Sequence, residues 1–265
     1  MKIAAFLFPV AILSASFGIP PTDTTASVPV MAGFDCSLFR SAVPQKSGDS
    51  AALEAVLRKM DAVSASFHTA EADFEWDNYQ KVIDDMVDVE TGSIYYRRVK
   101  QNIEMMAEVK KSGPSAAEVK PDAKFILFSE GKVRMYTPKT EQEMVYDLGK
   151  NRAAVDSFLV LGFGGSGEDL QKQFDVTYAG DETVNGVKTA KLNLVPKSDK
   201  VRDKYNRMIL WIDPDKGVSV QQQFFTPQGD YRLCKYSAIR MNGKVNDDVF
   251  RLKTTGKTQI VSPTG

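Results

Sequence analysis

The chain of 265 residues is long enough for one large domain or two small ones, and it can bury a substantial core. Lys plus Arg and Asp plus Glu both number 34, so no net charge draws the protein to nucleic acid or to an anionic membrane. We therefore do not expect long-range electrostatic attraction to be the main way in which it finds its partners, and we expect no nucleic-acid partner.

The first residues have the pattern of a secretory signal peptide. Met1 and Lys2 supply a short positive region, and the apolar run that ends at residue 13 is too short to span a membrane. The small residues Ser14 and Ser16 suit cleavage after residue 16, and a second candidate site ends at residue 32. We therefore expect an exported, periplasmic protein that is not an integral membrane protein after processing.

The next segment, 17–48, is rich in Pro, Thr, Ser and Gly and is expected to be a processed or poorly ordered lead-in. The folded domain is then expected over residues 49–265. The lead-in contains Cys36 and the folded domain contains Cys234. In an exported protein these two cysteines either form a disulfide or remain two separate thiols. Metal ligation is not favoured, because His68 is the only histidine and no Cys-x-x-Cys spacing occurs. We expect no metal and no cofactor.

A helix and a strand are expected at the start of this domain. The helix is predicted over residues 50–64, where apolar residues recur at helical spacing: Leu53, Val56, Leu57 and Met60. From Phe67 the period changes to two, with acidic residues on the other side, and the apolar side of the strand holds Ala70, Ala72, Phe74 and Trp76.

Further strands follow with short turns between them, which indicates antiparallel neighbours because parallel strands need a long crossover. They are predicted at residues 92–99, 102–110, 124–129, 132–137, 141–148, 174–180, 187–195, 207–213, 217–226 and 230–240. So many antiparallel strands in one sheet tend to curl or close.

One long break, residues 151–173, interrupts the strands. It has an apolar helical stripe that includes Val155, Phe158 and Leu159, then the glycine cluster 162–169, then a short helix. The glycine cluster is either a flexible hinge between two lid helices or an ordinary loop. The predicted fold class is mainly β with α (α+β): a single strongly curved antiparallel sheet that forms a half-open barrel, covered by an N-terminal helix and a mid-chain helical lid.

The order of these stretches resembles the periplasmic LolA-type lipoprotein carriers and their relatives with the LolA/LolB/RseB-like fold. The resemblance covers roughly residues 53–263. It rests on the helix end "VSASF" before "FEW", and on "TGSIYYRR", "SEGKVRMYTPKTEQEMVYDL", "SFLVLGFGG" and "ILWIDPDKGVSVQQQFFTPQGDY". The resemblance implies an apolar cavity for acyl chains and transport of lipid-modified proteins from an inner-membrane donor to an outer-membrane acceptor.

The sequence departs from the family at one point. Family carriers often have an Arg-Trp pair in the third strand, where the arginine helps to hold the closed lid. The matching stretch here is "QNIEMMAEVK", which has Met105 and Met106 near those positions and no arginine. The departure puts lid gating in doubt.

No catalytic constellation stands out. A Ser/His/Asp site would require His68, which we interpret as a residue of the surface or the barrel rim. The glycine cluster lacks the Lys-Ser/Thr ending of a phosphate loop and follows a helix instead of a strand. The acidic residues Asp84, Asp85, Asp88 and Glu90 lack calcium-loop spacing and are expected in a solvated turn. We do not expect an enzyme.

The sequence therefore predicts a periplasmic carrier that binds the acyl chains of lipoproteins, or lipids, in an apolar cavity. The alternative is a lipid-responsive sensor or adaptor of the same fold that binds a protein partner in the cell envelope. The expected cavity residues are Phe74, Trp76, Ile94, Tyr96, Met105, Leu192, Leu194 and Trp211 on the wall, and Val155, Phe158 and Leu159 on the lid.

Overall fold

The computed structural model describes residues 47–100, 102–149, 158, 161 and 163–262. Their strands are β1 (Thr69–Gln80), β2 (Asp85–Val99), β3 (Asn102–Gly113), β4 (Lys120–Ser129), β5 (Lys132–Thr137), β6 (Gln142–Asp147), β7 (Phe174–Val184), β8 (Val187–Pro196), β9 (Arg207–Asp213), β10 (Val218–Phe225), β11 (Tyr231–Met241) and β12 (Gln259–Val261). The helices are α1 (Ser47–Ala65), α3 (Gly167–Gln173) and α4 (Asp199–Arg202), with the 3₁₀ turns η2 (Pro138–Thr140) and η4 (Asp247–Phe250).

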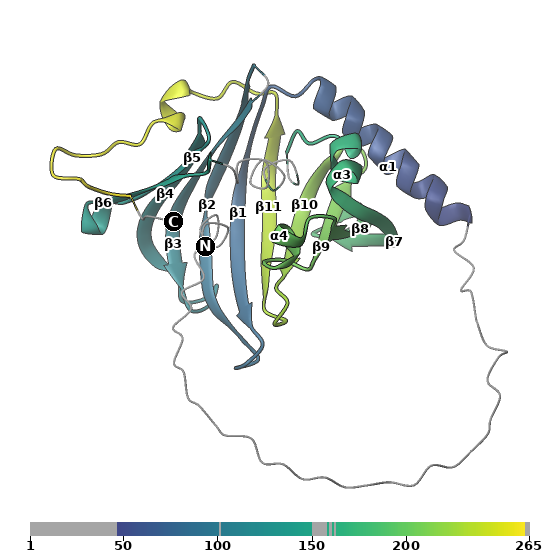
Figure 1. The fold of residues 1–265 in the computed structure, drawn as a ribbon, viewed down its shortest axis with the longest axis horizontal. Helices are drawn as coiled ribbons and strands as arrows, with labels where there is room; N and C mark the ends of the chain where they lie inside the picture. The colour runs from purple at the N-terminus through teal and green to yellow at the C-terminus, as the bar shows by residue number, and fades with distance from the viewer. Residues whose placement is uncertain (1–46, 101, 150–157, 159–160, 162, 263–265) are drawn as a thin grey trace, which may run out of the picture.

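All of these strands belong to one 12-stranded sheet in the order β12-β6-β5-β4-β3-β2-β1-β11-β10-β9-β8-β7. The sheet is open, because this order has two ends, β7 and β12, and it is strongly curved (Figure 1). Neighbours are antiparallel apart from β12, which runs parallel to β6. The first strand, β1, lies in the middle, between β2 and β11. The predicted mainly β, single-sheet fold is therefore confirmed, with a short parallel strand that the sequence pattern did not predict.

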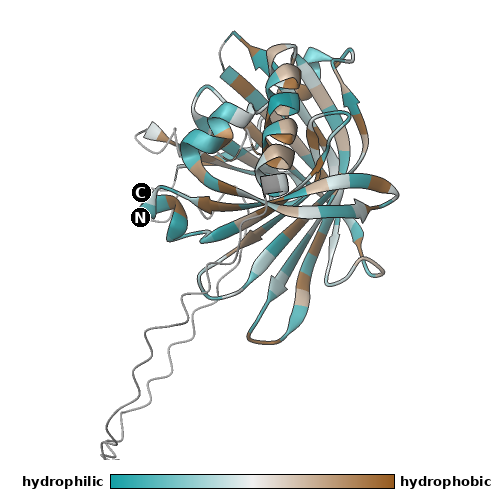
Figure 2. Cartoon of the chain, turned by 90° about the vertical axis from the view of Figure 1, so that its right-hand side faces the viewer, coloured by the Kyte–Doolittle hydropathy of each residue, from teal (hydrophilic) through white to brown (hydrophobic). Residues whose placement is uncertain are grey.

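The two faces of the sheet differ in polarity, and hydrophobic and hydrophilic residues alternate along its strands (Figure 2). We call the face that packs in one cluster with Val56, Leu57 and Met60 of α1 the inner face. The opposite, outer face is largely polar and carries ion pairs such as Lys235 with Glu75 at 2.6 Å. It also holds a smaller apolar cluster, where Phe250 of η4 packs on β3 and β4.

The helix α1 contacts α3 and β7, and two glycines allow the chain to approach it closely. A Cβ atom at Gly167 would lie 2.7 Å from Cβ of Leu57, and one at Gly164 would lie 2.3 Å from the ring of Phe67. Gly164 also has a φ of +80°, which side chains other than glycine rarely adopt. Of the glycines that we interpreted as a hinge or loop, Gly167 thus serves close packing of α3 against α1, and Gly164 serves close packing against Phe67, just after α1.

The predicted solvated acidic turn is wrong for three of its four residues. Asp84 lies in the turn after β1, whereas Asp85, Asp88 and Glu90 belong to β2. Glu90 is buried, with 1% of its surface exposed. The alternation of apolar and polar residues did not reveal this part of β2, because the inner face is charged at this end of the strand and apolar elsewhere. No helix among the described residues combines the length and apolarity that a membrane crossing requires.

Candidate functional site

The inner face is the main apolar surface of the molecule, and every strand from β1 to β11 contributes to its cluster. The core of this cluster consists of buried side chains. By strand they include Phe74 and Trp76; Ile94 and Tyr96; Met105, Ala107 and Val109; Ile126 and Phe128; Val133 and Met135; Tyr146; Phe174; Leu192 and Leu194; Met208, Leu210 and Ile212; Val218 and Phe224; and Cys234 and Tyr236.

The structure brings seven of the eight predicted wall residues together in this cluster: Phe74, Trp76, Ile94, Tyr96, Met105, Leu192 and Leu194. Phe74 and Trp76 stack with ring centroids 4.0 Å apart. They can do so because alternate residues of a strand share a face. Whether these residues bind a ligand stays a prediction.

Trp211 is the exception, and its predicted place on the wall is wrong. Its neighbours Leu210 and Ile212 are on the inner face, while Trp211 packs with Val184 and Val220 in a separate cluster. Nζ of Lys191 lies 4.9 Å from its ring centroid. The run Ile-Leu-Trp-Ile is apolar throughout, so it gave no alternation from which the face could be assigned.

The predicted lid is described only in part. Phe158 packs against the inner-face side, with ring centroids 5.7 Å from Tyr205 and 6.3 Å from Phe224. Val155 and Leu159 lie outside the described residues, so their predicted role stays a prediction. Further along, the described residues Leu161 and Phe163 are buried in the same cluster.

Phe163 is a residue that the sequence analysis missed. It is 0% exposed and lies between two tyrosines of the sheet, with centroids 5.1 Å from Tyr96 and 5.2 Å from Tyr236. Its position among glycines gave no helical or strand spacing. An apolar guest on the inner face would have to displace this ring or pack beside it.

An arginine does hold the glycine segment, although it comes from β2 instead of β3. Nη2 of Arg98 donates to the backbone carbonyl of Gly164 at 3.2 Å and to that of Ser64 at 3.4 Å. Its guanidinium carbon lies 5.6 Å from the ring centroid of Phe67. The hydroxyl of Ser64 also donates to the Gly164 carbonyl, at 2.8 Å. Arg98 thus links the end of α1 to the segment that precedes α3.

A group of polar side chains interrupts the apolar inner face at one end. We call Asn78, Asp88, Glu90, Lys124 and Arg232 the inner charge cluster. Arg232 is 3% exposed, and its Nη2 lies 3.3 Å from a carboxylate oxygen of Glu90. Lys124 Nζ bonds to the other oxygen of the same carboxylate. The Arg232 guanidinium also lies 4.6 Å above the ring of Trp76, which joins the cluster to the apolar wall.

The remaining members surround this pair of cations. Asn78 donates its side-chain N–H to Asp88 at 3.4 Å. Burial, followed by the negative charge of Glu90, raises the pKa of Asp88 above its ordinary value, while Lys124 and Arg232 oppose the shift. No local sequence pattern indicates this cluster, because it depends on the strand register, which pairs Asn78 with both Asp88 and Arg232.

Cys234 lies on the inner face, is 0% exposed and has no disulfide partner among the described residues. Cys36 lies outside the described residues, so the alternative of a disulfide stays a prediction. Burial raises the pKa of the Cys234 thiol to about 12, so it stays protonated at neutral pH. We expect a Cys36→Ser variant to resist alkylation by iodoacetamide while folded and to react fully once denatured, as measured by intact-protein mass spectrometry. Fast labelling of the folded variant would contradict this burial.

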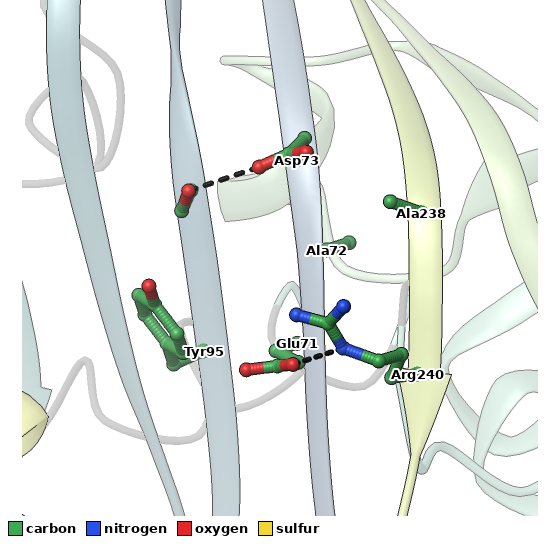
Figure 3. A pocket seen from close by; sticks show the side chains of 7 residues that line it. Glu71, Ala72, Asp73, Tyr95, Ala238 and Arg240 are labelled. Atoms are coloured by element: carbon green, nitrogen blue, oxygen red, sulfur yellow. Dashed lines mark hydrogen bonds and ion pairs between the residues drawn. The ribbon is translucent and has the colours of Figure 1, made fainter. Parts of the chain in front are cut away.

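Two pockets are lined by described residues. A small one of about 30 Å³ lies on the outer face, where Arg240 pairs with Glu71 and Ser93 donates to Asp73 (Figure 3). It has room for a water and for no larger ligand. A second one, of about 430 Å³, is lined by residues 112–114 and 117–120 where β3 meets β4. Within the described residues no group of His, Cys, Asp and Glu is arranged to hold a metal ion.

A protein-family model described as "Uncharacterized protein" matches residues 132–258. No curated protein matches the sequence. Among solved structures, MucB is 12% identical with a TM-score of 0.47, and the match covers 76% of this chain and 63% of MucB. The chain therefore spans less than two thirds of the length of MucB.

Two further structures are matched over nearly their full length. An uncharacterized conserved protein from Thermus thermophilus is 13% identical with a TM-score of 0.49, over 80% of this chain and 99% of that one. A LolA superfamily protein from Nitrosomonas europaea is 12% identical with a TM-score of 0.36, over 76% and 97%. The chain is similar to LolA superfamily proteins.

Proposed function

We propose that the protein is a periplasmic carrier that binds acyl chains of lipoproteins, or lipids, on the inner face and delivers them towards the outer membrane. The observation that supports this most directly is the continuous apolar cluster to which every strand from β1 to β11 contributes. Each CH₂ group of an acyl chain that leaves water contributes about 0.8 kcal/mol, so a wide apolar face can hold such a chain without a specific polar contact. The proposal assigns no catalytic step to the protein.

Entry of an acyl chain requires movement of the residues that cover this face. Phe158 and Phe163 pack against the aromatic side chains of the sheet, and a hydrocarbon tail would take their place. The cluster can accept such a change because methionines with soft, adaptable side chains, among them Met105, Met135 and Met208, are part of it. An inner-membrane donor and an outer-membrane acceptor would be the protein partners.

The direct test is to purify the exported protein, extract it with organic solvent and analyse the extract by mass spectrometry. We expect about one bound lipid or acyl chain per protein, and uptake of a fluorescent fatty acid by the delipidated protein. Absence of both would overturn the proposal. Recovery of a membrane-protein domain in a pull-down, at equal yield with and without lipid, would favour the sensor or adaptor instead.

The role of Arg98 can be tested separately. The Arg98→Met variant loses two charge-assisted hydrogen bonds to backbone carbonyls, at Ser64 and Gly164. We expect its free energy of unfolding to fall by about 1–3 kcal/mol. We also expect faster hydrogen exchange across α3 and a faster release of fluorescent fatty acid, as measured by mass spectrometry and fluorescence.

Arg97 provides the matched control. It is the adjacent residue of β2, and it pairs with Glu104 at 2.6 Å and Asp247 at 2.7 Å on the outer face. The Arg97→Met variant should leave hydrogen exchange in α3 and the release rate as in the wild type. If hydrogen exchange and fatty-acid release became equally faster in both variants, the hydrogen bonds of Arg98 to Ser64 and Gly164 would have no specific effect on the segment before α3.

A further inference from the structure

The larger pocket is lined by a residue whose cross-strand partner belongs to the inner charge cluster. Ser112 lines the pocket of about 430 Å³, a volume within the range of small-molecule sites. Across the β2–β3 pairing, Ser112 is the partner of Glu90, so the two residues share a face of the sheet. Ser112 also donates its hydroxyl to Asp122 at 2.8 Å, two residues before Lys124 in β4. One lining residue of the pocket, Ser112, is therefore the cross-strand neighbour of Glu90.

The cluster is not a feature that stability alone explains. Buried ion pairs often contribute no more than well-packed apolar side chains of similar volume, because the charges must leave water. Here Arg232 and Glu90 are almost fully buried, and each has an apolar partner on one adjacent strand, Phe224 for Arg232 and Trp76 for Glu90. Oδ1 of Asn78, a residue only 7% exposed, has no hydrogen-bond partner among the described residues. These polar groups lie where a ligand with a polar end would need them.

The two cations differ in how freely they can change partners. Both bind the Glu90 carboxylate, but the Lys124 side chain is 20% exposed and that of Arg232 only 3%. Lys124 can therefore turn towards a ligand, while Arg232 continues to neutralise Glu90. A lysine ammonium on a flexible stem suits such an exchange. With Asp88 ionised, the two cations and two carboxylates balance in charge, and loss of one carboxylate leaves an excess of positive charge.

We propose that the inner charge cluster binds the anionic head group, a carboxylate or phosphate, of a ligand whose acyl chain lies along the inner face. This inference rests on the proposed function. Lys124 supplies the direct contact to the head group, and Arg232 adds a fixed positive charge. The apolar wall begins at Trp76, directly beneath Arg232, so head and chain would be held by adjoining surfaces.

The test compares ligands with the same chain and different heads by isothermal titration calorimetry on the delipidated protein. Dodecanoate and dodecyl phosphate carry an anionic head, dodecanol a neutral one, and acetate an anion without a chain. We expect the wild type to bind the two anionic ligands about tenfold more tightly than dodecanol, because one additional charge-assisted contact contributes about this much to affinity. Acetate should not bind measurably, because most of the affinity comes from the chain.

Two variants should change this preference in opposite directions. Lys124→Met should bring dodecanoate binding down to that of dodecanol, and Asp88→Asn should strengthen dodecanoate binding several-fold, about threefold or more, because a repelling carboxylate is gone. Lys235→Met is the matched control, since its ammonium forms a comparable ion pair with Glu75 and Asp77 on the outer face. The preference is the ratio of dodecanoate to dodecanol binding within each protein, and dodecanol binding also shows that each variant is folded.

The outcomes separate the two proposals. Equal binding of dodecanoate and dodecanol by the wild type, or an unchanged preference in Lys124→Met, overturns the head-group site and leaves the carrier intact. Tight binding of acetate alone would show that the cluster takes a free anion, which also overturns the inference. Failure of every long-chain ligand to bind overturns the carrier, and the head-group site with it.

Discussion

Replacement of Phe163 by alanine is expected to lower the free energy of unfolding by about 3–5 kcal/mol, because it empties a fully buried site between two tyrosines. The same change is expected to widen the apolar space on the inner face. The delipidated variant should therefore bind a fluorescent fatty acid at least as tightly as the wild type, in spite of its lower stability. Urea denaturation measures the first effect and fluorescence titration the second.

Phe250→Ala is the matched control for this variant. Phe250 is also buried, but it packs on the outer face with Met106 and Leu127, under the guanidinium of Arg97 at 4.2 Å. We expect a comparable loss of stability without any gain in fatty-acid binding. An added fatty acid should also restore more stability to Phe163→Ala than to Phe250→Ala, because a ligand stabilises the folded state that binds it. Equal restoration would contradict a binding site on the inner face.

Replacement of Glu90 by glutamine is the second variant for which we expect a large effect. It removes the carboxylate that the buried guanidinium of Arg232 contacts at 3.3 Å, and it frees Lys124 at the same time. We expect a loss of about 3–5 kcal/mol in the free energy of unfolding, the usual result when one partner of a buried ion pair is removed. Urea denaturation at neutral pH measures it.

Glu75→Gln makes the same chemical change on the outer face. Glu75 and its partner Lys235 are each 34% exposed, and Lys235 retains Asp77 as a second partner at 2.7 Å. Exposed pairs of this kind contribute about 0–1 kcal/mol, so we expect little loss. If the two variants lost equal stability, the buried position of Glu90 would have no energetic consequence.

Local patterns were sufficient to predict most of the strands. The hairpin of β9 and β10 is an example, since its turn depends on neighbouring residues alone. The Asp213 carboxylate accepts the backbone N–H groups of Asp215 at 2.9 Å and Lys216 at 3.2 Å, and Gly217 takes a φ of +64°. Aspartate and glycine at these positions are what such a turn requires, so the sequence alone was enough.

Long-range features could not be predicted in this way. The pairing of β1 with β11 joins residues such as Phe74 and Tyr236, and no local pattern indicates that partner. The alternation of β1 told us that Phe74 and Trp76 share a face, but for Trp211 an apolar run left the face open. Glu90 was assigned to a turn because a carboxylate usually lies in water, and its burial is explained by the approach of Arg232 from β11 and of Lys124 from β4.

The central position of β1 has a consequence for biosynthesis. The seam between β1 and β11 joins the two halves of the sheet, and its registers pair residue 70 with residue 241. A nascent chain therefore cannot complete its core until almost all of it has been made, and closing so long a loop slows folding. Until then β1 and β10 are bare edges that can pair with other chains. A protein truncated before Tyr231 should consequently accumulate as aggregates, even though it contains all of the strands β1 to β10.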